Sequence, residues 1–184
     1  MNSKEKTEIA TLAGGCFWCL EAVFKQVKGV ITVIPGYTGG NTINPTYEQV
    51  STGKTGHAEA VQITFDPDVI SYPEILDIFF SIHDPTTLNQ QGADEGTQYR
   101  SAIFYHSEQQ ATYANAFILH LNREKIWQRG IVTQIVEFEK FYPAEAYHHD
   151  YFSKHPEQGY CQVVISPKLS KFRKEWASSL KKQP

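Results

Sequence analysis

The sequence predicts an α+β fold, a two-layer sandwich in which helices pack on a mixed β-sheet. Segments with alternating apolar residues, typical of strands, occur between segments with apolar residues at helical spacing. Some predicted strands follow one another directly and others are separated by a helix, which favours a sheet with both antiparallel and parallel pairs. No repeat, low-complexity run or Gly/Ser linker divides the 184 residues, so we expect a single domain over residues 1–184.

The boundaries of the predicted elements follow from the residues that end each segment. Gly14 and Gly15 end the first strand, and Gly29 closes the helix that follows it. Ser71 and Glu74 form a capping box ahead of the second helix. In chain order, we expect a strand at 8–14, a helix at 17–28, strands at 30–40 and 57–67, a helix at 72–82, a strand at 100–106, a helix at 108–121, a strand at 131–138 and a helix at 167–181.

Two segments show no period. Residues 141–165 are rich in Tyr, His, Pro and Gly, so we expect an ordered but irregular tail, and this tail carries Cys161. We expect residues 1–7 to be flexible.

The composition disfavours several classes of protein. The formal net charge of −3 at pH 7 gives no reason to expect nucleic acid or an anionic membrane as a partner. No apolar run is long enough to span a bilayer, and the N-terminal MNSKEKTE lacks the apolar core of a signal peptide. The 3 cysteines cannot all pair within one chain, which indicates thiols kept reduced in the cytoplasm. We expect a monomer.

The stretch LAGGCFWCLEAVF, residues 12–24, places Cys16 after two glycines at the start of an apolar helix. The unpaired amides and the helix dipole favour an anion there, so the sequence predicts a lowered pKa for the Cys16 thiol. Phe17 and Trp18 come too early for both to serve the buried face of the helix, and we expect them to wall an apolar pocket beside the sulfur. An inert buried thiol is the alternative, but the spacing to Cys19 is a recurrent redox and metal-binding pattern.

A carboxyl group falls on the apolar face of the third predicted strand. In TGHAEAVQITF, Glu59 shares a face with Val61 and Ile63, because side chains alternate along a strand. Burial would raise the pKa of Glu59 and keep it protonated, which makes it a candidate proton donor to a reactive sulfur. The alternative, that Glu59 reaches water at the frayed start of the strand, fits the sequence equally well.

Other polar residues lie in segments that, taken alone, are typical of surface loops. Asp94 and Tyr99 belong to NQQGADEGTQYRSAIFY, and Tyr47 belongs to NPTYEQV. The motif GYC, at 159–161, places Cys161 in the irregular tail, where a loop thiol is able to travel to another sulfur.

Together these motifs resemble the A-type peptide methionine sulfoxide reductases. The resemblance extends from about residue 11 to residue 165, through GGCFWCLEAVF, GYTGG, TYEQVSTGKTGHAEAVQITFDP, GTQYRSAIFYH, FYPAEAYHHDYFSKHP and GYC in this order. It implies an oxidoreductase that reduces methionine S-sulfoxide, free or in proteins, and so repairs proteins after oxidative stress.

The resemblance also implies a role for each residue at a matching position. These are the catalytic nucleophile Cys16, the acid Glu59, the hydrogen-bond donors Tyr47 and Tyr99, the substrate-binding residues Phe17, Trp18, Asp94 and His148, and the recycling thiol Cys161.

In the implied mechanism the Cys16 thiolate attacks the sulfoxide sulfur while Glu59 protonates the leaving oxygen. The resulting sulfenic acid condenses with Cys161, and an external dithiol such as thioredoxin reduces the disulfide. This chemistry requires no metal, flavin or nicotinamide, and the sequence contains no nucleotide-binding fingerprint.

Two departures from the family pattern concern thiols. Many relatives carry a small non-thiol residue at the position of Cys19, so Cys19 is either a second candidate for the resolving thiol or a packed bystander. Many relatives also carry a further recycling cysteine near a glycine-rich C-terminus, whereas SPKLSKFRKEWASSLKKQP contains none.

Two other classes of function are alternatives. A zinc-binding module would use Cys16, Cys19, Cys161 and a histidine of YHHDYF, whose donor types suit zinc. A thioredoxin-like oxidoreductase would use the Cys-x-x-Cys pair after a strand. Neither accounts for Glu59 on an apolar strand face.

Overall fold

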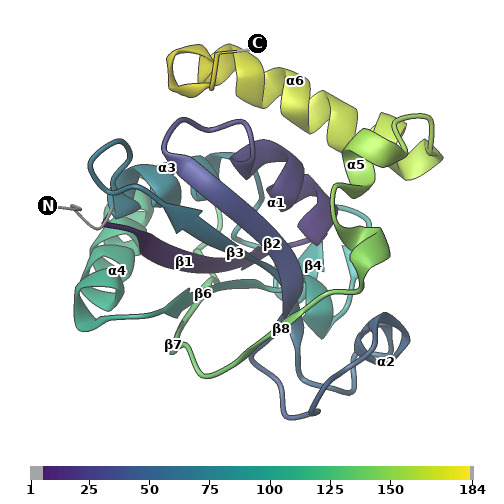
Figure 1. Cartoon of the computed structure of the whole chain (residues 1–184). Coiled ribbons are helices and arrows are strands. Elements are labelled where there is room, and N and C mark those ends of the chain that lie inside the picture. The colour runs from purple at the N-terminus through teal and green to yellow at the C-terminus, as the bar shows by residue number, and fades with distance from the viewer. Residues whose placement is uncertain (1–5, 183–184) are drawn as a thin grey trace, which may run out of the picture.

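A six-stranded sheet forms the centre of the molecule, in the order β7-β6-β1-β3-β2-β8 (Figure 1). The computed structural model describes residues 6–182. The strands of this sheet are β1 (Glu8–Gly14), β2 (Val30–Thr38), β3 (Ala58–Phe65), β6 (Ser101–Tyr105), β7 (Gln134–Glu137) and β8 (Phe141–Pro143). The β6–β7 pair is parallel and the other pairs are antiparallel. The mixed sheet predicted from the sequence is therefore confirmed.

Helices pack on the sheet and on one another. They are α1 (Phe17–Phe24), α2 (Tyr47–Ser51), α3 (Tyr72–Ser81), α4 (Glu108–Arg123), α5 (Tyr151–Lys154) and α6 (Ser166–Glu175). Helix α1 contacts β2 and β3, and α6 lies across α1 on the side away from the sheet (Figure 1). A separate short hairpin consists of β4 (Gln90–Gln91) and β5 (Asp94–Glu95). The α+β class is thus confirmed.

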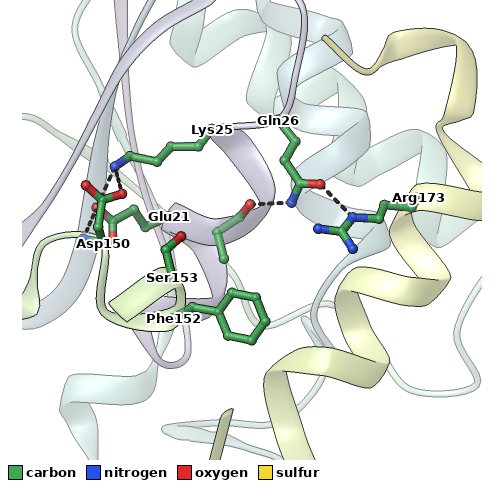
Figure 2. Close-up of a pocket in the computed structure, with 8 residues that line it drawn as sticks. Glu21, Lys25, Gln26, Asp150, Phe152, Ser153 and Arg173 are labelled. Atoms are coloured by element: carbon green, nitrogen blue, oxygen red, sulfur yellow. Dashed lines mark hydrogen bonds and ion pairs between the residues drawn. The ribbon is translucent and has the colours of Figure 1, made fainter. Parts of the chain in front are cut away.

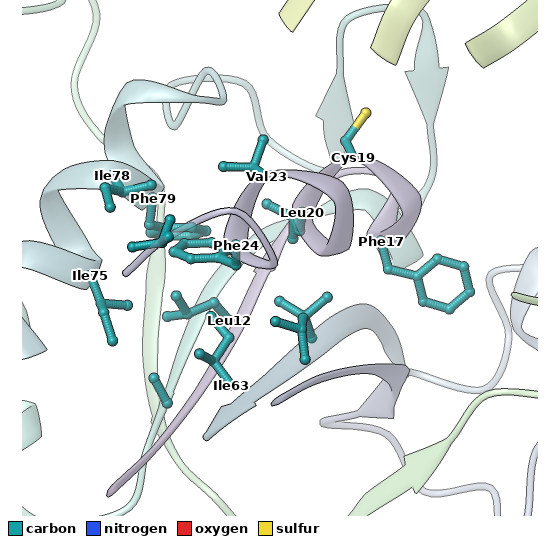
Figure 3. Packing of buried hydrophobic residues seen from close by; sticks show 14 of the residues in the cluster. Leu12, Phe17, Cys19, Leu20, Val23, Phe24, Ile63, Ile75, Ile78 and Phe79 are labelled. Atoms are coloured by element: carbon teal, nitrogen blue, oxygen red, sulfur yellow. The ribbon is translucent and has the colours of Figure 1, made fainter. Parts of the chain in front are cut away.

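The main apolar core lies between the sheet and the helices (Figure 3). Leu12 of β1 and Ile63 of β3 point from the sheet toward Leu20 and Phe24 of α1, and Phe79 of α3 packs in the same cluster. These residues occupy the positions that the alternation in the strands and the helical spacing in α1 predict.

Side-chain caps fix the start of two helices. Ser71 Oγ accepts the backbone N–H of Glu74 at 3.3 Å, and the Glu74 carboxylate accepts the backbone N–H of Ser71 at 2.8 Å. The capping box is confirmed. At the start of α4, Ser107 Oγ accepts the N–H of Gln110, whereas the Gln110 side chain accepts the N–H of His106.

The prediction that residues 141–165 are irregular is wrong. This segment contains β8, the 3₁₀ turn η2 (Ala146–His148), α5 and the π-helical turn η3 (Cys161–Ile165). Each element is too short for a period to appear in the sequence, and tertiary contacts define it. For example, the N–H of Ala144 donates to the carbonyl of Pro35 and so holds the end of β8 against β2.

The C-terminal helix is shorter than the predicted 167–181. Helix α6 ends at Glu175, and a 3₁₀ turn, η4 (Ala177–Ser179), follows it. Hydrogen bonds to other elements replace the last helical turn, because the indole of Trp176 donates to Ser81 Oγ and Leu180 forms a β-bridge with Val27. The prediction of flexibility for residues 1–7 falls mostly on residues 1–5, outside the described part of the chain.

The sheet register brings two distant segments together at one end of the molecule. In the antiparallel β1–β3 pair, Leu12 faces Val61, so the chain leaving β1 passes beside the start of β3. The pairing of β1 with β3 therefore brings Cys16 and Glu59 to the same end of the sheet.

Among residues 6–182, no helix is long and apolar enough to cross a membrane.

The capping box gives a stability prediction. Ser71→Ala removes the acceptor for the N–H of Glu74, so we expect it to lower the free energy of unfolding by about 1 kcal/mol. Thermal unfolding would then shift down by about 2–4 °C. Ser170→Ala, at an exposed position of α6, is the control and is expected to leave the transition within about 1 °C. An equal effect of both substitutions would contradict the capping role.

Candidate active site

A cavity of about 210 Å³ lies where β1 leads into α1. Its volume has room for several water molecules and so for a small side chain. The residues that line it come from distant parts of the chain: Cys16, Trp18, Tyr47, Glu59, Asp94, Tyr99, Gln158 and Tyr160. Most of the residues predicted for the site are thus brought together here.

Cys16 occupies the N-cap position of α1, directly after a glycine in the left-handed region. Gly15 has φ +93°, and a Cβ atom at this position would lie 2.6 Å from Cγ of Gln91, so only glycine fits the turn. The Cys16 side chain lines the cavity, but the residue is only 8% exposed. The turn therefore presents the sulfur to the cavity while it keeps bulk water away.

Burial decides the ionisation of this thiol. It raises the pKa of Cys16 well above its usual value, and a hydrogen bond to the Cys19 thiol and the nearby Glu59 act in the same direction. The prediction of a lowered pKa is therefore wrong for the substrate-free protein, because desolvation outweighs the helix N-terminus. The same hydrogen bond from Cys16 lowers the pKa of Cys19.

Glu59 is buried and lines the same cavity. It is 2% exposed, and its Oε1 accepts the backbone N–H of Phe17 at 3.2 Å. Burial raises the pKa of Glu59 to about 8, although the bond from Phe17 acts in the opposite direction. The alternative of a frayed, hydrated Glu59 is wrong, since this residue pairs with Tyr37 within the β2–β3 ladder. At neutral pH the carboxyl is protonated and able to donate.

Two tyrosines bring hydroxyl groups to the cavity. Tyr47 begins α2, and Tyr99 ends the 3₁₀ turn η1 (Thr97–Tyr99). Burial raises the pKa of both, with Glu59 contributing, so both stay protonated hydrogen-bond donors. The N–H of Tyr47 donates to the Glu145 carboxylate at 3.0 Å, and the Gln98 amide donates to the carbonyl of Ser51 at 3.3 Å. The first bond ties α2 to the segment before η2, and the second joins η1 to α2.

Trp18 forms the aromatic wall of the cavity. Its ring stacks on Tyr151 with centroids 3.7 Å apart and planes 6° apart, and its indole N–H donates to Nδ1 of His148 at 3.0 Å. Tyr160 meets the edge of the same ring. The indole is therefore held on several sides.

Several predicted site residues do not line the cavity. Phe17 is fully buried, with its ring against Tyr37 and His148, and only its backbone N–H reaches Glu59. His148 is buried behind Trp18. Cys161 is also fully buried, in η3, so the prediction of a loop thiol is wrong.

Sequence reasoning missed two residues of the cavity. Tyr160 donates its hydroxyl to Asp94 Oδ2 at 2.5 Å, and Gln158 lines the cavity while its Oε1 accepts the N–H of Cys161 at 3.3 Å. Tyr160 stands inside the GYC motif, directly before the thiol, and this position was the available signal. For Gln158 the sequence carried no signal.

The four donors of the alternative zinc site do not converge. Within residues 6–182, no group of at least three His, Cys, Asp or Glu side chains has an arrangement that could hold a metal ion.

The family model described as peptide methionine sulfoxide reductase matches residues 8–180. The chain belongs to the peptide methionine sulfoxide reductase family. The family membership confirms the resemblance and the enzyme class predicted from the sequence, and the zinc-binding and thioredoxin-like alternatives are therefore wrong.

Relatives within the peptide methionine sulfoxide reductase family are similar over nearly the whole chain. The peptide methionine sulfoxide reductase MsrA of Sulfolobus acidocaldarius is 60% identical over 169 residues, 92% of this chain and 95% of that protein. MsrA of Thermus thermophilus is 55% identical over 174 residues, 95% of this chain and 98% of that protein.

Solved structures of the family share the fold. Methionine sulfoxide reductase A of Corynebacterium diphtheriae superposes with a TM-score of 0.81 at 34% identity, covering 89% of this chain and 81% of that one. Mxr1 from Saccharomyces cerevisiae in complex with Trx2 superposes with a TM-score of 0.55 at 26% identity, covering 82% of this chain and 88% of that one.

The raised pKa of Glu59 predicts how stability depends on pH. Its folded-state pKa of about 8 exceeds the ordinary value of 4.5, so the folded state binds the proton more tightly than the unfolded chain. The resulting stabilisation is complete below pH 4.5 and is lost as the pH rises to about 8. Because Gln cannot ionise, Glu59→Gln is expected to lose less unfolding free energy than the wild type between about pH 5 and about pH 8.5.

Urea unfolding at a series of pH values measures this difference. Glu157→Gln, at an exposed position, is the control and is expected to follow the wild type. Parallel pH profiles for Glu59→Gln and the wild type would mean that Glu59 is not protonated at neutral pH.

Proposed function

We propose that this protein reduces methionine S-sulfoxide, free or in proteins, with Cys16 as the nucleophile and Glu59 as the acid. One observation carries the proposal: a carboxyl group with a pKa of about 8 lines the same small cavity as the sulfur of Cys16. A sulfoxide needs a nucleophile on its sulfur and a proton on its oxygen, and the cavity offers both at once. The names of the MsrA relatives support the substrate, and the S epimer follows from the resemblance to the A-type reductases.

The reaction couples the thiol of Cys16 to the protonated carboxyl group of Glu59, because both line the same cavity. Glu59 donates its proton to the sulfoxide oxygen, the sulfur of Cys16 bonds to the sulfoxide sulfur, and the proton of Cys16 passes to the Glu59 carboxylate. Overall one thiol and one sulfoxide give one sulfenic acid and one thioether, with the oxygen transferred to Cys16 and no net change in protons.

Hydroxyl groups around the oxygen assist this step. Tyr47 and Tyr99 donate hydrogen bonds to the oxygen as negative charge develops on it, in a cavity from which most water is excluded. Asp94 accepts a hydrogen bond from the hydroxyl of Tyr160 and so shapes the part of the cavity wall that adjoins Trp18.

The apolar part of the substrate lies against Trp18. Its indole is an aromatic surface of the cavity, and the S-methyl group packs on it. His148 positions Trp18 by accepting the indole N–H, while Phe17 supports the site from the core.

Two thiols resolve the sulfenic acid in sequence. Cys19 stands in the first turn of α1, three residues after the N-cap residue Cys16, so the two side chains are neighbours. Cys19 attacks the sulfenic acid, which releases water and forms a Cys16–Cys19 disulfide. Burial and the nearby Cys19 raise the pKa of Cys161, so the two thiols lie within electrostatic reach of one another. Cys161 then attacks Cys19 and frees Cys16 for another turnover.

An external dithiol protein of the thioredoxin type reduces the Cys19–Cys161 disulfide. The solved complex of Mxr1 with Trx2 supports this partner. We place the protein's site of action in the cytoplasm, because 3 cysteines cannot all pair within one chain and so indicate thiols kept reduced.

The acid role of Glu59 predicts a defect in chemistry. Glu59→Gln places an amide where the donor was, so the single-turnover rate at saturating peptide sulfoxide is expected to fall by about 10²–10⁴-fold. Substrate affinity is expected to stay within about threefold. Cys16→Ser is expected to abolish product formation. An unchanged single-turnover rate in Glu59→Gln would refute the acid role.

The order of the two resolving thiols predicts two distinct trapped species. Cys161→Ser is expected to form one product per enzyme, accumulate a Cys16–Cys19 disulfide and turn over slowly with thioredoxin. Cys19→Ser is expected to retain a long-lived sulfenic acid on Cys16 that a dimedone-type reagent labels. Mass mapping distinguishes the species. A direct Cys16–Cys161 disulfide in Cys19→Ser, formed at the wild-type rate, would contradict this order.

A further inference from the structure

A second buried carboxyl group lies on α1, outside the cavity. Glu21 is 2% exposed, and the backbone N–H of Asp150 donates to both of its oxygens, at 3.0 and 3.1 Å. The ammonium group of Lys25 lies 3.4 Å from Oε1 of Glu21 and also contacts the Asp150 carboxylate (Figure 2). Glu21 therefore clamps a single backbone amide of the C-terminal segment onto α1.

The clamped residue has an unusual backbone conformation. Asp150 has φ 57° and ψ 30°, in the left-handed region that residues other than glycine rarely adopt. This conformation turns the chain from η2 into α5 and directs the amide of Asp150 at Glu21. The Glu21 carboxylate thus holds a turn that is locally unfavourable.

The residues on either side of this turn are the ones that hold Trp18. His148, two residues before Asp150, accepts the indole N–H at 3.0 Å, and Tyr151, one residue after it, stacks on the ring at 3.7 Å. Trp18 itself stands three residues before Glu21 on α1. The clamp therefore joins the helix that carries the indole to the segment that holds it.

We propose that Glu21 is a positioning residue, which sets the orientation of Trp18 in the cavity through the backbone amide of Asp150. Since the indole forms the apolar wall for the substrate, Glu21 acts on sulfoxide binding without touching the substrate. This inference rests on the proposed function, because it takes methionine sulfoxide as the ligand of that wall.

The contact between the backbone N–H of Asp150 and the two oxygens of Glu21 sets the orientation of Trp18, and the ion pair between Lys25 and Glu21 does not. The side chain of Lys25 is 37% exposed, and pairs of this kind contribute little because water and salt screen them. By contrast, Glu21 is buried and the single N–H of Asp150 is shared between both of its oxygens, so loss of this contact leaves buried polar groups unpaired. Loss of Lys25 and loss of the Glu21 carboxylate are therefore expected to differ.

A substitution of Glu21 tests the proposal. Glu21→Gln keeps the size of the side chain but replaces one acceptor oxygen by a donor. We expect the KM for a methionine sulfoxide peptide to rise about tenfold, with kcat within about twofold. Lys25→Met and Asp150→Gly both leave the N–H of Asp150 and the Glu21 carboxylate in place, so KM is expected to stay within about twofold. A general loss of folding would instead lower the active fraction and leave KM unchanged.

A double-mutant cycle with Trp18→Phe tests whether Glu21 affects KM through Trp18. Phenylalanine cannot donate to His148, so Glu21→Gln is expected to add no further increase in KM in that background. An unchanged KM in Glu21→Gln, full additivity with Trp18→Phe, or a tenfold rise in KM in Lys25→Met or Asp150→Gly would overturn the proposal. Lys25→Met and Asp150→Gly test the proposal even where Glu21→Gln does not fold. Failure of the wild type to reduce the peptide would refute the proposed function instead.

Discussion

The hydrogen bond from the backbone of Phe17 to the buried carboxyl of Glu59 links the fold to the chemistry of the site. It joins the start of α1 to the start of β3, and so fixes the turn that carries Cys16. The same carboxyl lies among apolar residues of the sheet, where ionisation would leave a charge with little solvation. Its protonated state at neutral pH is therefore a consequence of the sheet register, because that register decides which strand face Glu59 occupies.

The start of α1 applies two opposing influences to Cys16. The helix N-terminus favours a thiolate, whereas burial and the neighbouring Glu59 favour a thiol, and burial dominates. In the resting protein the reactive sulfur is thus held as a thiol beside a protonated acid. This arrangement limits reaction with small oxidants, since the thiolate is the reactive form. Reactivity then depends on a ligand that stabilises the thiolate inside the cavity.

The sequence predicted the features that arise from local pattern. The alternation of β3 placed Glu59 on the apolar face, and two glycines placed Cys16 at the end of a strand. It did not predict features that arise from distant contacts. The pKa of Cys16 depends on the whole surroundings of the turn, and β8 and η3 exist because their backbones pair with, or pack on, other elements. Tyr160 reaches Asp94 because the segment before η3 packs against Trp18 of α1, and no local pattern encodes that contact.

The protonation state of Glu59 is the central claim, and infrared difference spectroscopy of the protein against Glu59→Gln measures it directly. The account predicts the carbonyl band of a protonated carboxylic acid at neutral pH, present in the wild type, absent in the variant and lost as the pH rises past about 8. A carboxylate band assigned to Glu59 at about pH 6, near two units below that value, would contradict the account.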